Sequence, residues 1–123
     1  MPTILLADDS ALIRTMVKRI LNEEPKIVVL GEAENFKDAI EKAAELKPDI
    51  LLLDLHMPDD QALLPEYIKT HLRPLGSTLK IVGMSLTGDN DSEARELGAS
   101  LGASTVLEKA RFEDQLIPAI LSC

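Results

Sequence analysis

Apolar and polar positions follow two alternating patterns along this chain. Short apolar runs of four or five residues recur, and between them lie longer stretches in which apolar residues return every three or four positions. Runs of the first kind are typical of strands buried on both faces, and the longer stretches are typical of amphipathic helices. The runs that predict strands are 3–7, 27–30, 50–53, 80–84 and 104–107.

Helix signals separate these runs. Ser10 and Asn35 stand where helix caps are expected, and Pro48 follows the second helical stretch. Pro118 interrupts the last helical stretch and removes a backbone hydrogen bond, so we expect a kink or a restart there. Strands alternating with helices predict an α/β fold, a single five-stranded parallel sheet with helices on both faces. The stretches that predict helices are 12–21, 36–44, 63–72, 94–101 and 112–121.

The fourth helical stretch carries the weakest pattern. Its apolar face has little more than Ala94, Leu97 and Leu101, and Gly98 lies inside it. Poor burial and a glycine within a helix both lower the stability of the helix. We therefore expect a lightly held, mobile element here.

Acidic residues follow two of the predicted strands at the point where each apolar run stops. Asp8 and Asp9 come after the run 3–7, and Asp54 comes after the run 50–53. In open parallel sheets, ligands bind in the crevice beyond the carboxyl ends of the strands. Three carboxylates in one crevice repel one another, and a hard divalent cation with oxygen ligands relieves that repulsion. The pattern therefore predicts a metal-binding acidic site.

Two further predicted strands end in polar residues of other kinds. The run 80–84 is followed by Ser85, and the run 104–107 is followed by Glu108 and then Lys109. Taken singly, a residue of these types is more often a helix cap, a turn residue or a surface lysine than a functional group. Acids, a hydroxyl and an ammonium at one edge of one sheet together favour a functional site.

The length and composition predict one domain, residues 1–123. With 46% apolar residues the chain can form a single core, and no apolar stretch approaches the roughly 20 residues that cross a bilayer. The single cysteine, Cys123, leaves no internal disulfide and favours the reducing cytoplasm. The net charge of -8 disfavours direct binding to nucleic acid or to an anionic membrane.

The polar residues at the strand ends resemble those of one known family, the response-regulator receiver domain of two-component signalling. Residues 54–58 (Asp-Leu-His-Met-Pro) are similar to the family's Asp-x-x-Met-Pro segment, and Gly102-Ala103 before the last strand also matches. The resemblance covers the whole chain and implies a flavodoxin-like (βα)5 fold with strand order 2-1-3-4-5. The residues that carry it are, in chain order, Asp8, Asp9, Asp54, Ser85 and Lys109.

The resemblance also implies a cofactor. Mg2+ is expected to bind Asp9 and Asp54 directly, the backbone carbonyl of His56, and Asp8 through water. Mg2+ favours octahedral oxygen coordination through one or two carboxylates and several waters, so this set of ligands suits it.

In the same way, the resemblance implies a role for each remaining polar residue. Asp54 is expected to be the nucleophile that takes a phosphoryl group and forms an acyl phosphate. Lys109 is expected to neutralise phosphoryl oxygens as a point charge. Ser85 is expected to donate a hydrogen bond to the phosphoryl group and so to draw the following loop inward.

The implied function is a signalling switch rather than an enzyme acting on an external substrate. The donor is expected to be a sensor histidine kinase or a histidine phosphotransfer protein. The response is expected to reach a downstream protein or output domain through the face formed by the fourth helix, fifth strand and fifth helix, or to cause homodimerisation. The chain is then a stand-alone regulator or the receiver of a longer, DNA-binding one.

Four positions modify this expectation. Leu86 stands where the family commonly has a small residue, and Val106 stands where it usually presents an aromatic switch residue. Ala110 replaces the proline that usually follows the lysine, so we expect a trans peptide with a shifted Lys109, or a strained cis peptide. The His56 side chain, if it faces the phosphoryl group, is expected to alter the lifetime of the phosphorylated form, which His56→Ala tests.

Two alternatives remain open. Leu86, Val106 and Ala110 motivate an atypical receiver that acts as a phosphorylation-independent interaction module. A phosphoaspartate hydrolase is the enzymatic alternative, but those enzymes place the nucleophile on the first strand with a second acid two residues on. In this chain the residue two positions after Asp54 is His56, and the acid pair comes first.

Overall fold

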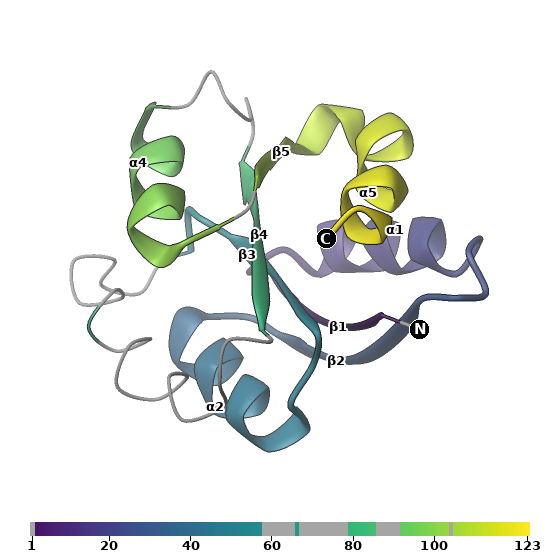
Figure 1. Ribbon diagram of the computed structural model, residues 1–123, viewed down its shortest axis with the longest axis horizontal. Coiled ribbons are helices and arrows are strands. Elements are labelled where there is room, and N and C mark those ends of the chain that lie inside the picture. The colour runs from purple at the N-terminus through teal and green to yellow at the C-terminus, as the bar shows by residue number, and fades with distance from the viewer. Residues whose placement is uncertain (1, 58–65, 67–78, 86–91, 104) are drawn as a thin grey trace.

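The structure is a computed structural model, and it describes residues 2–57, 66, 79–85, 92–103 and 105–123. Its centre is a parallel five-stranded sheet with strand order β2-β1-β3-β4-β5, which confirms the predicted order (Figure 1). The strands are β1 (Thr3–Ala7), β2 (Val28–Ala33), β3 (Ile50–Asp54), β4 (Lys80–Ser85) and β5 (Thr105–Glu108).

Helices cover both faces of this sheet, as expected. Helices α1 and α5 lie on one face, and α2 and α4 lie on the other (Figure 1). The predicted helix at 63–72 falls outside the described residues, apart from Glu66, which is helical. None of the helices in the described ranges is long and apolar enough to cross a membrane. The helices are α1 (Ala11–Leu21), α2 (Phe36–Leu46), α4 (Ser92–Leu101), α5 (Phe112–Leu121) and the short 3-10 helix η4 (Lys109–Arg111).

Alternate residues of each strand face opposite sides of the sheet and build two cores. Leu5, Leu51 and Leu53 pack with the buried residues of α2 and with Ala94 of α4. Leu6 and Leu52 pack on the other side with the buried residues of α1 and α5. Both faces of the central strands are therefore apolar, which explains the continuous apolar runs in the sequence.

The predicted caps of the first two helices are confirmed. The Ser10 hydroxyl accepts a hydrogen bond from the Ile13 N–H at 3.2 Å, and the Asn35 side chain accepts one from the Asp38 N–H at 2.8 Å. Each bond satisfies a backbone donor that the first turn of a helix leaves without a partner. The cap at Ser10 starts α1 directly after the acidic pair that follows β1.

The second strand differs from its prediction. It begins at Val28 and continues to Ala33, whereas the apolar run stopped at Leu30. Because β2 is the edge strand beside β1 alone, its residues are mostly half-buried, and polar Glu32 is tolerated opposite Leu6. The extension matters because it carries the chain as far as the end of β1.

The helical stretches near the C-terminus also differ from expectation. α5 runs unbroken through Pro118, so the expected restart was wrong. Leu116 and Ile120 are buried on either side of the proline, and their packing against the sheet holds the helix together. In α4, Gly98 is buried, and a Cβ there would lie 3.2 Å from Val106 Cγ2. This glycine therefore serves close packing, while the expected mobility of α4 stays a prediction.

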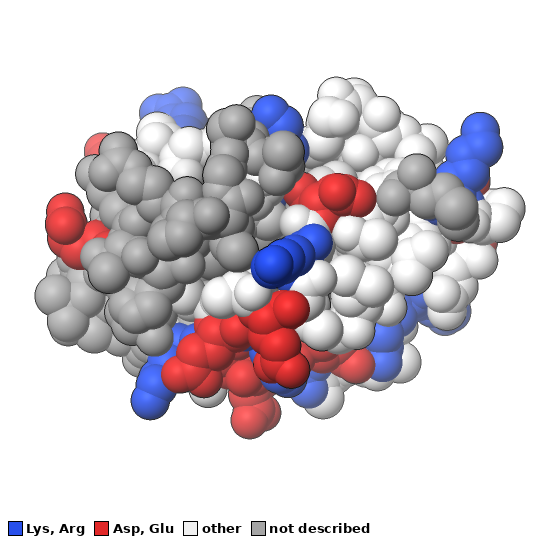
Figure 2. Space-filling view, turned by 60° about the horizontal axis from the view of Figure 1, so that its bottom comes forward, with Lys and Arg blue, Asp and Glu red and all other residues white. Residues whose placement is uncertain are grey.

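Charge is unevenly spread over the surface. On the face that Figure 2 displays, acidic side chains gather in a patch at the lower centre, and basic side chains lie scattered around it. This agrees with the net charge of -8.

Candidate functional site

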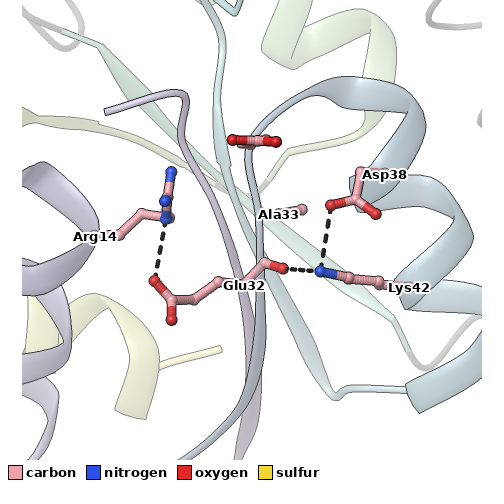
Figure 3. Close-up of a pocket in the computed structure, with 6 residues that line it drawn as sticks. Arg14, Glu32, Ala33, Asp38 and Lys42 are labelled. Atoms are coloured by element: carbon pink, nitrogen blue, oxygen red, sulfur yellow. Dashed lines mark hydrogen bonds and ion pairs between the residues drawn. The ribbon is translucent and has the colours of Figure 1, made fainter. Parts of the chain in front are cut away.

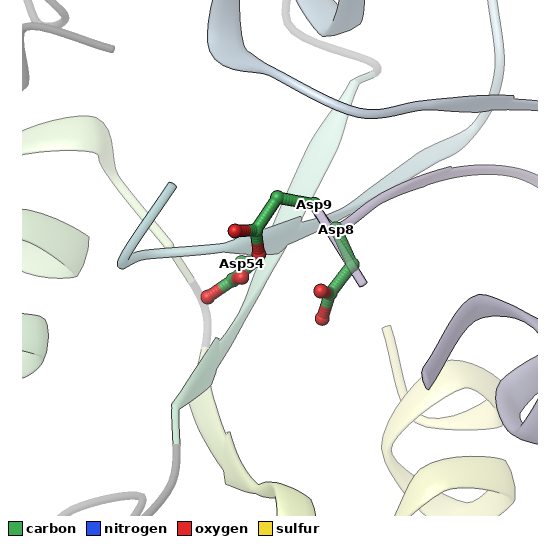
Figure 4. A group of neighbouring side chains, drawn as sticks. All are labelled: Asp8, Asp9 and Asp54. Atoms are coloured by element: carbon green, nitrogen blue, oxygen red, sulfur yellow. The ribbon is translucent and has the colours of Figure 1, made fainter. Parts of the chain in front are cut away.

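Three carboxylates meet at the carboxyl end of the sheet. β1 and β3 are neighbouring parallel strands with Ala7 opposite Leu53, so the residues that follow, Asp8 and Asp54, lie side by side. One oxygen from each of Asp8, Asp9 and Asp54 lies within 4.8 Å of the others (Figure 4). Asp8 and Asp54 are buried, whereas Asp9 is exposed. The strand ends therefore bring these acids together as the sequence predicted.

Lys109 joins this group from the end of β5. Its Nζ lies 2.9 Å from Asp8 Oδ2 and 3.2 Å from Asp54 Oδ2, and its side chain is largely buried. No peptide bond in the described ranges is cis, so of the two outcomes expected at Ala110 the trans peptide is present. The ammonium nevertheless reaches both carboxylates, and the trans bond does not move it out of the site.

Electrostatics at the site reflect one cation among three acids. Burial raises the pKa of Asp54, and the neighbouring Asp8 carboxylate raises it further, while the His56 N–H and Lys109 pull it down. The His56 N–H donates to Asp54 Oδ1 at 3.0 Å. Burial by itself lowers the pKa of Lys109, but the carboxylates of Asp8 and Asp54 outweigh burial, so its pKa is raised and it stays protonated.

One buried oxygen of the acid pair lacks a good donor. Asp8 Oδ1 accepts a hydrogen bond from the Ser10 N–H at 2.9 Å. Asp8 Oδ2 pairs with the Lys109 ammonium, but in the part of the chain described here it receives no hydrogen bond of acceptable geometry. A buried carboxylate oxygen in this condition is costly, and a bound cation would relieve the cost. The residues present therefore fit a divalent metal ion.

Ser85, the predicted hydroxyl donor, ends β4 at the same edge of the sheet. It is buried and lies in register with Glu108 of β5, and its neighbour Met84 is in register with Asp54. His56 is exposed two residues after Asp54, and its effect on lifetime stays a prediction. Leu86 lies outside the described residues.

Val106 faces away from the acidic group, into the core between the sheet and the helices α2 and α4. It is 9% exposed and approaches the backbone positions of Gly83 and Gly98, where added Cβ atoms would lie 3.4 Å and 3.2 Å from its Cγ2. Two glycines thus surround the position at which the family resemblance leads one to expect an aromatic ring.

Sequence reasoning missed two residues next to the site, Arg14 and Glu32. Arg14 of α1 donates to the backbone carbonyl of Asp8 at 2.6 Å. It also pairs with Glu32 of β2 at 3.1 Å, as Figure 3 shows. An arginine on an amphipathic helix carries no spacing signal, and Glu32 fell beyond the predicted end of its strand. Extending that strand would have placed Glu32 opposite Leu6, two residues before Asp8.

Comparison with known families agrees with this geometry. The family described as response regulator receiver domain matches residues 4–121, nearly the whole chain. The chain belongs to this family. The acidic group at the end of β1 and β3 is therefore the acidic, metal-binding pocket of a receiver domain.

Curated relatives share their similarity with this receiver domain over only part of their length. Protein-glutamate methylesterase/protein-glutamine glutaminase 2 of Methanosarcina acetivorans is 41% identical over 107 residues, which are 85% of this chain and 28% of that protein. The nitrate/nitrite response regulator protein NarL of Escherichia coli is 52% identical over 56 residues, 46% of this chain and 26% of that protein. The matched regions thus span about a quarter of the length of these relatives.

Solved structures show the same fold. The response regulator domain of Thermotoga maritima CheB has a TM-score of 0.77 at 25% identity, with 99% of this chain and 95% of that chain covered. The signal receiver domain of NarL from Mycobacterium tuberculosis has a TM-score of 0.81 at 25% identity, covering 99% and 94%.

Proposed function

We propose that this receiver domain is a phosphorylation-dependent switch in which Asp54 accepts a phosphoryl group from a histidine. The donor is a sensor histidine kinase or a histidine phosphotransfer protein. One observation carries the proposal: a buried carboxylate at the end of the central strand lies among two further acids and a lysine ammonium. A nucleophile, a cation site and a fixed positive charge are the parts that phosphoryl transfer requires.

The transfer is a single displacement at phosphorus. A carboxylate oxygen of Asp54 attacks the phosphoryl group on the donor imidazole, an O–P bond forms and the P–N bond breaks. The electron pair of the broken bond stays on the imidazole nitrogen, which takes up a proton. Hydrolysis later moves the phosphoryl group to water, which regenerates the carboxylate and releases inorganic phosphate. The chemistry is thus confined to the domain itself, with no external substrate turned over.

Attack requires that Asp54 be ionised, and two of its contacts favour this form against the effects of burial and of the Asp8 charge. The Lys109 ammonium at 3.2 Å and the His56 N–H at 3.0 Å both stabilise the carboxylate. Because Lys109 also pairs with Asp8, it lies between the two acids and can turn toward phosphoryl oxygens. Ser85, buried at the adjacent strand end, donates its hydroxyl to the arriving group in this proposal.

Mg2+ is the cofactor that we propose for the acidic pocket. Asp9 and Asp54 would hold it directly, the backbone carbonyl of His56 would add a ligand, and Asp8 would bind it through water. Carboxylate, carbonyl and water oxygens are the ligands that Mg2+ prefers. When bound, it supplies positive charge that offsets the charge on the phosphoryl oxygens.

The response, in this proposal, leaves the domain through the face of α4, β5 and α5. A new charge at Asp54 alters this face, and the change alters binding to a downstream protein, an output domain or a second copy of the chain. A curated relative of about three times the length matches only over 107 residues, 28% of that protein, which supports a receiver that serves a longer regulator.

A phosphorylation-independent interaction module is the second candidate. The observation that favours it is Val106, which packs against Gly98 of α4, so no aromatic side chain is present there to change its orientation. The position of Lys109 argues the other way, because the lysine reaches both carboxylates despite Ala110.

Intact mass after incubation with acetyl phosphate tests the proposal. We expect wild type to gain one phosphoryl group with Mg2+ present and to gain none in EDTA, because the site holds the cation. Asp54→Asn removes the nucleophile and should gain none under either condition, whereas Asp114→Asn, at an exposed acid of α5, should behave as wild type. Equal gain by Asp54→Asn would contradict the assignment, and no gain by wild type would favour the interaction module.

A further inference from the structure

Arg14 makes two contacts that phosphoryl transfer at Asp54 does not require. Its Nη1 donates to the backbone carbonyl of Asp8 at 2.6 Å, and its Nε pairs with Glu32 Oε1 at 3.1 Å (Figure 3). The side chain is only 17% exposed. A planar guanidinium held at two of its nitrogens has a fixed orientation, so it presents Nη1 to one carbonyl in one direction.

Glu32 is itself held from three sides. Lys18 Nζ binds its Oε2 at 2.9 Å, and Lys42 Nζ donates to its backbone carbonyl while pairing with Asp38 at 3.3 Å. The hydrogen bond from Lys18 lowers the pKa of Glu32, burial opposes this, and Arg14 lowers it further, so the carboxylate is ionised. Contacts from α1 and α2 therefore fix the partner of Arg14.

The carbonyl that Arg14 binds belongs to the peptide between the two acids of the pair. Asp8 is already held by its N–H, which donates to the Ala33 carbonyl at 3.0 Å, and by its Oδ1, which accepts from Ser10. Asp9, in contrast, has no hydrogen-bond or ion-pair partner for its carboxylate within the described part of the chain. Its position is therefore set by the backbone, and the peptide after Asp8 decides where it points.

We propose that Arg14, braced by Glu32, is a positioning residue for the metal site. It fixes the carbonyl of Asp8 and thereby places the Asp9 carboxylate beside Asp54, ready to bind Mg2+. The inference rests on the proposed function, because it takes these acids as the ligands of the cation. It adds that the site is shaped before a phosphoryl group arrives, by a contact from α1.

Charge and positioning predict opposite effects when Arg14 is removed. Arg14 is a cation near a cation site, so by charge alone Arg14→Gln should tighten Mg2+ binding. If Arg14 positions Asp9, the same change should weaken Mg2+ binding by about 10-fold. This is the size of effect seen when a residue that orients a metal ligand is replaced. Titration calorimetry with Mg2+ at low and high potassium chloride separates the two, because salt screens a charge effect and leaves a positioning effect.

Matched variants control the measurement. Lys18→Gln also removes a positive charge that pairs with Glu32, but it leaves the contact with the Asp8 carbonyl in place. This variant should bind Mg2+ as wild type does or slightly more tightly. Arg14→Lys can make only one of the two contacts well and should fall between wild type and Arg14→Gln. Glu32→Gln should weaken binding, and adding it to Arg14→Gln should cost little more, because the two residues act as a unit.

The outcomes separate this inference from the proposed function. If wild type fails to bind Mg2+, the proposed cofactor is wrong. If wild type binds and Arg14→Gln binds equally or more tightly, the positioning role alone is overturned. Thermal unfolding in EDTA shows whether each variant is folded. If Arg14→Gln is unfolded, the Mg2+ affinities of Arg14→Lys and Glu32→Gln test the positioning role instead. Wild-type Mg2+ affinity in both of these variants would overturn that role.

Discussion

Asp54 carries its charge where burial opposes it. The carboxylate is 1% exposed and has Asp8 as a neighbour, and its pKa is raised above 3.8 by burial first and by Asp8 next. Between pH 3.8 and the raised pKa, the folded protein binds more protons than the unfolded chain. The free energy of unfolding therefore falls as the pH rises through that window. A functional acid is held here at some cost to stability.

Asp54→Asn should raise stability in EDTA at neutral pH, because it removes the buried charge and keeps the shape of the side chain. The gain in stability should shrink as the pH falls toward 3.8, because Asp54 of the wild type becomes protonated and no longer carries a buried charge. Urea unfolding at neutral and at acidic pH measures both effects, with Asp114→Asn as the exposed control. Lower stability of Asp54→Asn at neutral pH would show that Lys109 and the His56 N–H outweigh burial.

Single residues differ in how far the sequence reveals them. Asp8, Asp9, Asp54 and Lys109 stand directly after apolar runs, and the parallel sheet fixes where such residues meet. Arg14 acts through a backbone carbonyl, a contact that leaves no mark on spacing or composition. A residue that binds the backbone of a predicted site can therefore be recognised only in the structure.

At the scale of elements, the contact of β4, α4 and β5 depends on two glycines around Leu55. Leu55 follows Asp54 directly and is fully buried. A Cβ at Gly83 would lie 2.7 Å from Leu55 Cδ1, and one at Gly98 would lie 3.7 Å from the same atom. The residue next to Asp54 therefore packs where α4 approaches the sheet, which links Asp54 to α4 in the switch that we propose.

Gly83→Ala should lower the free energy of unfolding by about 1–3 kcal/mol, because the new methyl group overlaps Leu55 in a filled core. In a Leu55→Ala background the same change should cost clearly less, since the overlapping side chain is gone. Urea unfolding of the four proteins measures the coupling. Equal cost in both backgrounds would mean that Leu55 is not the obstacle.

The elements themselves were partly predictable. Apolar runs placed all five strands, and the central strands have continuous runs because both of their faces are buried. β2 continued past its run because an edge strand tolerates Glu32, and α5 continued through Pro118 because buried neighbours hold it. In both cases tertiary packing overrides the local signal.

At the scale of the whole molecule, the sheet order determines the site. Because β1 and β3 are neighbours at its centre, the acids at their ends share one crevice, and β4 and β5 bring Ser85 and Lys109 to the same edge. The alternation of strands and helices predicted a parallel sheet, and the family resemblance implied the strand order that makes β1 and β3 neighbours. The sequence pattern could not show that Arg14 of α1 contacts Asp8, or that Lys42 of α2 contacts Glu32, the partner of Arg14.

The central claim is that Asp54 itself accepts the phosphoryl group, and its most direct test locates the modified residue. Wild type would be treated with acetyl phosphate and Mg2+, reduced with borohydride, digested and analysed by tandem mass spectrometry. Borohydride converts an acyl phosphate on aspartate to homoserine, so the account predicts homoserine at position 54 and unchanged aspartate at Asp8 and Asp9. Homoserine at either member of the acid pair, with Asp54 intact, would contradict it.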